Sequence, residues 1–431
     1  MPKTTRAPFL LAAEGRAPSM FSKRLPAVHE VNRVTRALAA RTRPYLDLTV
    51  SNPTSVGLRS GETDLFDSAA SAPDARILAA LADPRGLSYA PDPRGLLKAR
   101  TSVSNYYAAL HGVLAPPDQI VLTASSSEAY GWLFKLLADP GDVVLVPAPS
   151  YPLLDVLTEL ECLSLRRYAL ASDDGFSFHA AAVAAEVRRV EGEGHRVAAV
   201  VVVNPNNPTG TSLAGQELAD LMALARERRF AVVSDEVFVD YRYSDRPGDV
   251  RVAAAAASTS APEALVFSLG GLSKSAGLPQ LKLGWIFANG PAGLLEEAIE
   301  RLEWIADSYL SVSTPVQLAL PRLLEHGRKT ADAIWARVLR NARALQASFP
   351  EGGPVTVLPV PAGWAACLRV PAIRPEEDLV LDLLESNDVL VQPGYFFDFP
   401  FEAFLVLSLL PVPEVFREGI ARLAQVLTIR A

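Results

Sequence analysis

The sequence predicts an α/β fold with a mainly parallel central sheet flanked by helices, joined to a smaller α+β domain. Two observations support this fold class. Between about residues 120 and 287, short runs of Val, Ile and Leu alternate with longer amphipathic stretches, a pattern typical of a parallel sheet covered on both faces. After residue 290, long amphipathic helices are followed by a mixture of short strands and helices.

The first region contains six expected strands, each a short apolar run bounded by turn or helix signals. They cover residues 120–123, 143–146, 198–203, 231–234, 264–268 and 283–287. Amphipathic stretches between them, such as 128–137 and 213–229, predict the flanking helices.

The second region begins with two predicted helices, 294–306 and 331–349, and the Ser313-Thr-Pro315 signal starts another helix between them. Further strands are expected at 355–358, 365–370, 389–391 and 405–409, and further helices at 376–386 and 413–427. We expect a flexible extension over residues 1–20 and an N-terminal segment of the small domain over 21–65. The large α/β domain then covers 66–292, and an interdomain helix with the C-terminal small domain covers 293–431.

Composition narrows the function classes. The 431 residues carry a formal charge of −7, which offers no basic field for nucleic acid. No apolar run approaches the roughly 20 residues of a membrane span. Cys162 and Cys367 are too few for a disulfide framework, and the five histidines show no metal-ligand spacing. We therefore expect a cytoplasmic protein with no metal site, no membrane contact and no nucleic-acid partner.

Polar residues follow the predicted strands where each strand ends, and open α/β sheets bind ligands at that edge. The segments are 123–128, 147–152, 204–210, 234–236 and the loop around Lys274. Lys274 stands among small residues, which leave room for an aldehyde cofactor held as a Schiff base.

The other strand ends match the remaining needs of one such cofactor, pyridoxal 5'-phosphate. Asp235 ends a buried strand, where a carboxylate stabilises a protonated pyridine nitrogen. Ser125 and Ser126 precede a predicted helix whose first N–H groups suit a phosphate. Tyr151 is placed to stack on the ring, and Asn207 to donate to its phenolic oxygen.

Simpler interpretations remain open for some of these residues. Ser125 and Ser126 are equally explained by a helix N-cap, and Tyr151 by packing against the neighbouring prolines. Asp235 and the Asn207 segment each suit an ordinary turn. The combination with the Lys274 loop is what favours the cofactor.

The order of the motifs resembles the class I/II aminotransferases of the fold-type I pyridoxal-phosphate enzymes. The matching segments are Asn207-Pro-Thr-Gly210, Asp235-Glu-Val237, Ser273-Lys274, Gly277-Leu-Pro279 and Gly284-Trp285. The resemblance extends from about Leu46 to the C-terminus. It implies an aminotransferase that moves an amino group between an amino donor and a keto acid through a Lys274 aldimine.

The resemblance also implies a homodimer. Tyr89, six residues before Gly95, lies in a segment similar to the one whose tyrosine reaches the neighbouring subunit's cofactor phosphate in that family. Ser273 and Lys282 would complete the phosphate contacts within the same subunit.

Three positions depart from the family pattern near the cofactor. Phe238 stands where the family commonly has a tyrosine that shares the phenolic oxygen. Gly271 replaces a phosphate-binding serine, for which Ser273 or Ser268 would substitute. Lys282 replaces an arginine, so a point charge takes the place of a bidentate fork.

A fourth departure concerns the substrate. Val406 stands where the family carries the arginine that clamps the substrate α-carboxylate, and no Lys or Arg occurs between Pro375 and Phe416. Arg59, Arg94 and Arg369 are candidate substitutes, although a plain surface position is the favoured interpretation of each. The phenylalanines at 396, 397, 399 and 401 either line an apolar pocket or belong to the core, and residues 50–54 are expected to face the same site.

Two other function classes remain as alternatives. A pyridoxal-phosphate lyase of the same fold would share every residue named above. A non-catalytic pyridoxal-phosphate-binding protein would also need them. A nucleotide-binding dehydrogenase is disfavoured, because no Gly-x-Gly-x-x-Gly follows the first strand.

Overall fold

A computed structural model describes residues 20, 22–24, 31–58, 75–243, 252–253 and 263–429 of the chain. The extension expected over residues 1–20 lies outside the described residues except for Met20, and so does Arg59.

A seven-stranded sheet forms the larger part of the molecule, in the order β2-β8-β7-β6-β5-β3-β4. β8 runs antiparallel to both of its neighbours and the other pairs are parallel, which confirms the prediction of a mainly parallel α/β sheet. In sheet order the strands are β2 (Ile120–Thr123), β8 (Gly284–Asn289), β7 (Val266–Gly271), β6 (Ala231–Asp235), β5 (Val197–Val203), β3 (Val143–Ala148) and β4 (Ser164–Ala169).

Helices cover both faces of this sheet, so side chains of both orientations along the central strands are buried. On β5, Val201 and Val203 face one core and Val200 and Val202 face another. The first core also contains side chains of α4 (Ser126–Leu137), α5 (Leu153–Leu160) and α10 (Ala292–Tyr309). The second contains those of α6 (Ala180–Gly192) and α7 (Gly215–Arg228). Burial on both sides explains why the strands read as continuous apolar runs.

The edge strand β4 was not predicted. It carries Arg166 and Arg167, which form ion pairs with Glu193 and Asp155 at the surface. Because the strand is only partly buried, its sequence lacks the continuous apolar run that identifies the central strands.

The smaller unit contains an antiparallel sheet in the order β12-β13-β10-β9. These strands are β12 (Gln392–Pro393), β13 (Phe404–Ser408), β10 (Ala365–Arg369) and β9 (Thr356–Val357), and α12 (Glu376–Asn387) and α13 (Pro413–Ile429) accompany them. The N-terminal segment joins this unit, since β1 (Leu46–Asp47) pairs with β11 (Val389–Leu390) and α1 (Arg33–Ala40) packs on α12. The domain boundaries given above stay a prediction.

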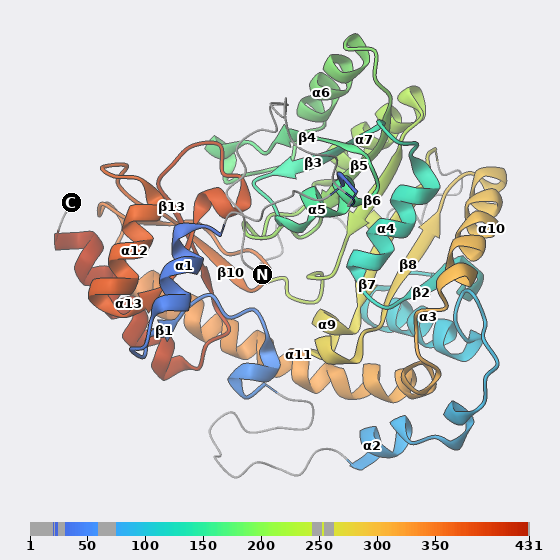
Figure 1. Ribbon diagram of the computed structural model, residues 1–431, viewed down its shortest axis with the longest axis horizontal. Coiled ribbons are helices and arrows are strands. Elements are labelled where there is room, and N and C mark those ends of the chain that lie inside the picture. The colour runs from blue at the N-terminus through green and yellow to red at the C-terminus, as the bar shows by residue number, and fades with distance from the viewer. Residues whose placement is uncertain are drawn as a thin grey trace.

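One long helix, α11 (Thr314–Ser348), connects the two units, so the prediction of separate helices on either side of residue 331 was wrong. It continues through Pro321 because Leu320 and Leu323 around that residue pack in one apolar cluster. Figure 1 shows α11 running along the bottom of the view, from beneath the smaller unit to α9 (Leu272–Ser275) and α3 (Leu97–His111). Despite this length, no helix among the described residues has the apolar character that a membrane span requires.

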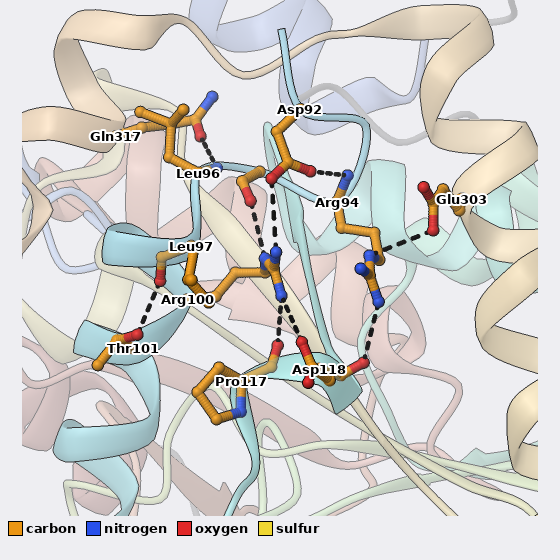
Figure 2. Close-up of polar contacts among 11 residues, drawn as sticks. Asp92, Arg94, Leu96, Leu97, Arg100, Thr101, Pro117, Asp118, Glu303 and Gln317 are labelled. Atoms are coloured by element: carbon orange, nitrogen blue, oxygen red, sulfur yellow. Dashed lines mark hydrogen bonds and ion pairs between the residues drawn. The ribbon is translucent and has the colours of Figure 1, made fainter.

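A buried arginine fixes the turn that leads into α3 (Figure 2). Arg100 is 3% exposed and donates to the backbone carbonyls of Gly95 and Pro117, at 2.8 Å each, and to the carboxylates of Asp92 and Asp118. Gly95 has a positive φ of 91°, and a Cβ there would lie 2.5 Å from the Leu122 side chain. The segment that follows Tyr89 is therefore held rigidly against β2.

We predict that Arg100→Met destabilises the protein by about 2 to 4 kcal/mol, because buried carbonyls lose their donors. Urea unfolding followed by circular dichroism measures this. Arg85→Met is the matched control, since Arg85 forms only an exposed ion pair with Asp83 and its loss should not measurably change stability. Equal effects of the two substitutions would contradict the structural role of Arg100.

Candidate active site

The carboxyl ends of β2, β3, β5, β6 and β7 lie along one edge of the large sheet. β2 joins this set because β8 is antiparallel both to β2 and to β7, which gives those two strands the same direction. The polar segments that follow the five strands therefore converge at one edge, as the sequence predicts for a ligand site.

Lys274 lies on α9, directly after β7; the residue is half-buried, with its amine end surrounded by protein. Its Nζ lies 4.3 Å from the centroid of the Trp364 ring and 5.1 Å from that of Phe238. Within the described residues, the Nζ atom makes no hydrogen bond or ion pair. Burial lowers the pKa of Lys274 to about 8, and the negative charge of Asp235 opposes that shift. At pH 7 about a tenth of this amine is therefore uncharged and nucleophilic, far more than for an ordinary lysine.

Asp235 ends β6 and is buried beside the same site. Its Oδ2 accepts a hydrogen bond from the Tyr130 hydroxyl at 3.0 Å, and its Oδ1 accepts one from the Val237 N–H at 3.1 Å. Burial raises the pKa of Asp235, while both hydrogen bonds and the Lys274 charge act against the rise. The carboxylate is thus held in a fixed orientation with little water around it.

Tyr130 is a site residue that sequence reasoning missed. It lies on α4, four residues after Ser126, and this spacing places both residues on the same face of the helix. That periodicity was the available signal, because a helix that begins at the ligand edge presents this face to the site.

Aromatic side chains cover the other side of Lys274, and these too were not anticipated beyond Phe238. Trp364, which comes just before β10 in the smaller unit, packs edge-on against Phe238 and Tyr241. The Tyr241 hydroxyl donates to the Lys274 carbonyl at 2.7 Å. The Trp364 indole Nε1 is buried without a hydrogen-bond partner in the described part of the chain. Lys274 therefore lies where the two units meet.

The N-terminus of α4 forms a capping box, which confirms the N-cap interpretation of Ser125. Ser125 Oγ accepts from the Glu128 N–H at 3.1 Å, and the Glu128 carboxylate accepts from the Ala124 N–H at 2.6 Å. The N–H groups of Ser126 and Ser127 have no partner among the described residues, so they remain available to an anion.

Lys282 is exposed, with a positive φ of 50°, and lies two residues before Gly284. A Cβ on Gly284 would lie 3.3 Å from the Ser125 backbone, so Lys282 and the α4 N-terminus are at the same edge of the sheet. Ser273 is half-buried beside Lys274, whereas Ser268 is buried inside β7 with an unpaired hydroxyl. Of the two hydroxyls, that of Ser273 is thus the better placed to contact the cofactor phosphate.

Tyr151 and Asn207 follow β3 and β5 on loops that are tied together. The Asn206 side chain donates to the Pro149 carbonyl at 3.1 Å, and the Ser150 N–H donates to the Phe397 carbonyl at 2.8 Å. The Tyr151 ring is 46% exposed; burial and, to a smaller extent, the Asp235 charge raise its pKa. Tyr151 therefore lies within electrostatic range of Asp235.

Other residues named from the sequence lie elsewhere. Tyr89 is 87% exposed. Arg94 forms an ion pair with Glu303 at 3.2 Å, and Arg369 is exposed. Phe397 and Phe399 belong to an apolar core, which favours packing over a pocket for these two rings.

Residues 50–54 reach the site from the N-terminal segment. The Ser408 hydroxyl donates to the Val50 carbonyl, and the Pro53 side chain lies next to Gly277, three residues after Lys274. The expectation that this segment faces the site agrees with these contacts.

These residues fit pyridoxal phosphate. Among the described residues the Lys274 amine has no polar partner, which suits covalent attachment, and two N–H groups at the α4 start have none either, which suits a phosphate. The buried Asp235 carboxylate at the sheet edge suits a ring nitrogen. The three features lie along the same edge of the sheet.

The model of the family "Aminotransferase class I and II" matches residues 53–422. The chain belongs to this family. It is thus a pyridoxal-phosphate-dependent aminotransferase of fold type I.

Named relatives and solved structures agree with the assignment. An alanine aminotransferase of Mycobacterium tuberculosis is 28% identical over 92% of this chain and 89% of its own length. A glutamate-pyruvate aminotransferase AlaA of Haemophilus influenzae is 27% identical over 92% and 94%. The structure of an alanine aminotransferase from Pyrococcus furiosus superposes with a TM-score of 0.78, at 22% identity, over 92% of this chain and 95% of that one.

The surroundings of Lys274 predict a pH profile for cofactor capture by the cofactor-free aminotransferase. The neutral amine reacts, so the rate of reductive trapping of pyridoxal phosphate should rise with pH through a midpoint near 8. In Asp235→Asn the charge that favours the protonated amine is gone, and the midpoint should fall below the wild-type value.

Glu236→Gln is the matched control. It removes a buried carboxylate from the adjacent position, but that carboxylate is not among the groups that shift the pKa of Lys274, so the midpoint should stay near 8. An Asp235→Asn midpoint equal to or above wild type would contradict the assigned interaction.

Proposed function

We propose that this aminotransferase moves an amino group from an amino donor to a keto acid, with Lys274 as the attachment point of the cofactor and as the proton carrier. The observation that carries the proposal is the Lys274 amine, which lies against Trp364 and Phe238 and has no hydrogen-bond or ion-pair partner among the described residues. Burial opposes its protonation and the Asp235 charge favours it. Bound pyridoxal phosphate supplies the electron sink that makes the donor Cα–H acidic.

With pyridoxal phosphate and a donor bound, the Lys274 Nζ would take the proton from the donor Cα and return it to the adjacent cofactor carbon. This needs a neutral Nζ within a water-poor space, which the cover of Trp364 and Phe238 supports. Tyr241 would limit the movement of the lysine backbone through its bond to the Lys274 carbonyl.

The remaining roles are assigned from position. Asp235, oriented by Tyr130 and the Val237 N–H, would hold the proton on the ring nitrogen. Tyr151 would cover the ring and Asn207 would donate to its phenolic oxygen. The phosphate contacts would be the helix start at Ser125 and Ser126, together with Ser273 and Lys282.

We also propose that the protein is a cytoplasmic homodimer. Leu87 and Tyr89 are 92% and 87% exposed. Neighbouring apolar side chains with this exposure indicate a surface that another protein chain covers. Beside them lies a cavity of about 140 Å³ lined by Tyr89, Trp132, Leu310 and other residues. A second copy that covers this surface would receive Tyr89 near its own α4 N-terminus.

The function test is a pair of half-reactions with the cofactor-loaded protein. A donor should convert the visible band of the aldehyde form into that of the amine form, and a carbonyl acceptor should restore it. Alanine, glutamate and simple amines form the first donor panel. Lys274→Ala should lose the conversion by at least about a thousandfold, since the proton carrier is gone.

The same experiment separates the alternatives. Release of ammonia or of another leaving group, without formation of the amine form, would indicate a lyase. Cofactor binding without any reaction across the panel would indicate a binding protein and overturn the proposal.

Light scattering measures the molecular mass and so tests the oligomeric state. We expect twice the chain mass of 46.2 kDa at micromolar concentration. Substitution of Leu87 by Asp should shift the mass toward one chain, whereas Ile373→Asp, another exposed apolar position far from Tyr89 in the sequence, should not. A wild-type protein of single-chain mass over the whole concentration range would refute the dimer.

A further inference from the structure

Three neutral side chains form a row across the sheet of the smaller unit. Val406 on β13 pairs directly with Gln392 on β12 and with Cys367 on β10. Residues directly opposite one another share a face of the sheet, so the three side chains point the same way. Val406 and Cys367 are buried, and Gln392 is half-buried.

This row faces the loop that carries Asn207. Cys367 Sγ lies 3.6 Å from the carbonyl oxygen of Pro208, the residue after Asn207. One step along the same face, the Ser408 hydroxyl reaches the Val50 segment that leads to Gly277. The row therefore forms the wall of the smaller unit against the Asn207 loop, and Val406 and Cys367 belong to the same apolar core as Phe397 and Phe399.

Two arginines near this wall do not offer it a free cation. Arg369 shares the face but pairs with Phe404, one step farther from Val50, and is exposed. Arg337 is buried, and its Nη1 donates to the carbonyls of Val56 and Leu410. Between Pro375 and Phe416, the stretch that supplies two of the three strands, the sequence contains no Lys or Arg at all.

A carboxylate placed against this wall would be costly. Burying an ionised carboxylate without a cation costs several kcal/mol, and one buried cation with good geometry is what normally offsets that cost. Lys274 cannot serve, since its amine is needed for the covalent and proton-transfer roles.

We propose that the site takes amino donors that lack an ionised α-carboxylate, with a neutral or apolar group against the Val406 row. This inference rests on the proposed aminotransferase function and narrows its substrate class. The faces of Trp364 and Phe238 beside Lys274 add further apolar surface that suits such a donor. An acceptor occupies the same space, so its carboxylate, where it has one, lies farther along its chain.

The reaction stays balanced for this class. A donor R₂CH–NH₂ and the cofactor aldehyde give R₂C=O and the aminomethyl form of the cofactor, the Cα proton ending on the cofactor carbon. A carbonyl acceptor reverses these steps and leaves as the amine, so no oxidant, reductant or further reactant is required.

The direct test compares L-alanine with L-alaninamide in the donor half-reaction of the cofactor-loaded enzyme. The two differ only in whether the group on Cα is an anion or a neutral amide. We expect alaninamide to react at least about tenfold faster at equal concentration of free amine, since it avoids the unpaired charge. Equal rates, or a faster reaction of alanine, would overturn the inference.

A binding measurement compares the affinities of the two kinds of donor without the rate of the reaction. 2-Aminoisobutyrate and its amide carry no Cα–H, so they bind without transamination, and the shift of the visible band gives their dissociation constants. The amide should bind at least about tenfold more tightly. Tighter binding of the carboxylate would contradict the proposal.

Val406→Arg should supply the cation that the wall lacks. Relative to Val406→Met, a long neutral control, the arginine should raise the alanine rate about tenfold or more and leave that of alaninamide unchanged or lower. If Val406→Arg does not fold, the two wild-type comparisons still decide the question. A wild-type enzyme that reacts with neither donor, and with no amine of the panel, would refute the aminotransferase proposal itself, whereas a preference for alanine refutes only the substrate class.

Discussion

The structure depends on keeping one lysine amine buried next to one buried carboxylate. Burial disfavours the charged form of both groups, so Lys274 has a lowered pKa and Asp235 a raised one, and each partly offsets the shift of the other. Asp235 ends β6 and Lys274 follows β7, and these two strands are adjacent and hydrogen-bonded. A nucleophilic amine near neutral pH is the consequence.

The second requirement is that the site be closed from the other side. Trp364 of the smaller unit lies over the Lys274 amine, and its packing on Phe238 and Tyr241 ties that unit to the loop after β6. The helix α11 passes beneath both units (Figure 1). The position of the smaller unit therefore determines both the exposure of the lysine and the chemistry of the wall around Val406.

Sequence patterns predicted the parts of this arrangement that are local. Continuous apolar runs located the central strands, and the polar residues after them located Lys274, Asp235 and the α4 start, because strand direction alone brings such residues to one edge. The edge strand β4 was not predicted, because half-exposed strands carry no such apolar run. The site role of Trp364 was not predicted for a different reason. Its contact with Lys274 joins two units, and no local sequence spacing indicates such a contact.

The central claim is that Lys274, and no other lysine, carries the cofactor. Reduction of the holoprotein with borohydride, followed by digestion and peptide mass analysis, tests this most directly. The added pyridoxyl mass should lie on the peptide containing Lys274, with Lys282 in the same stretch unmodified. Pyridoxyl mass on Lys282 or another lysine, or none on the peptide with Lys274, would contradict it.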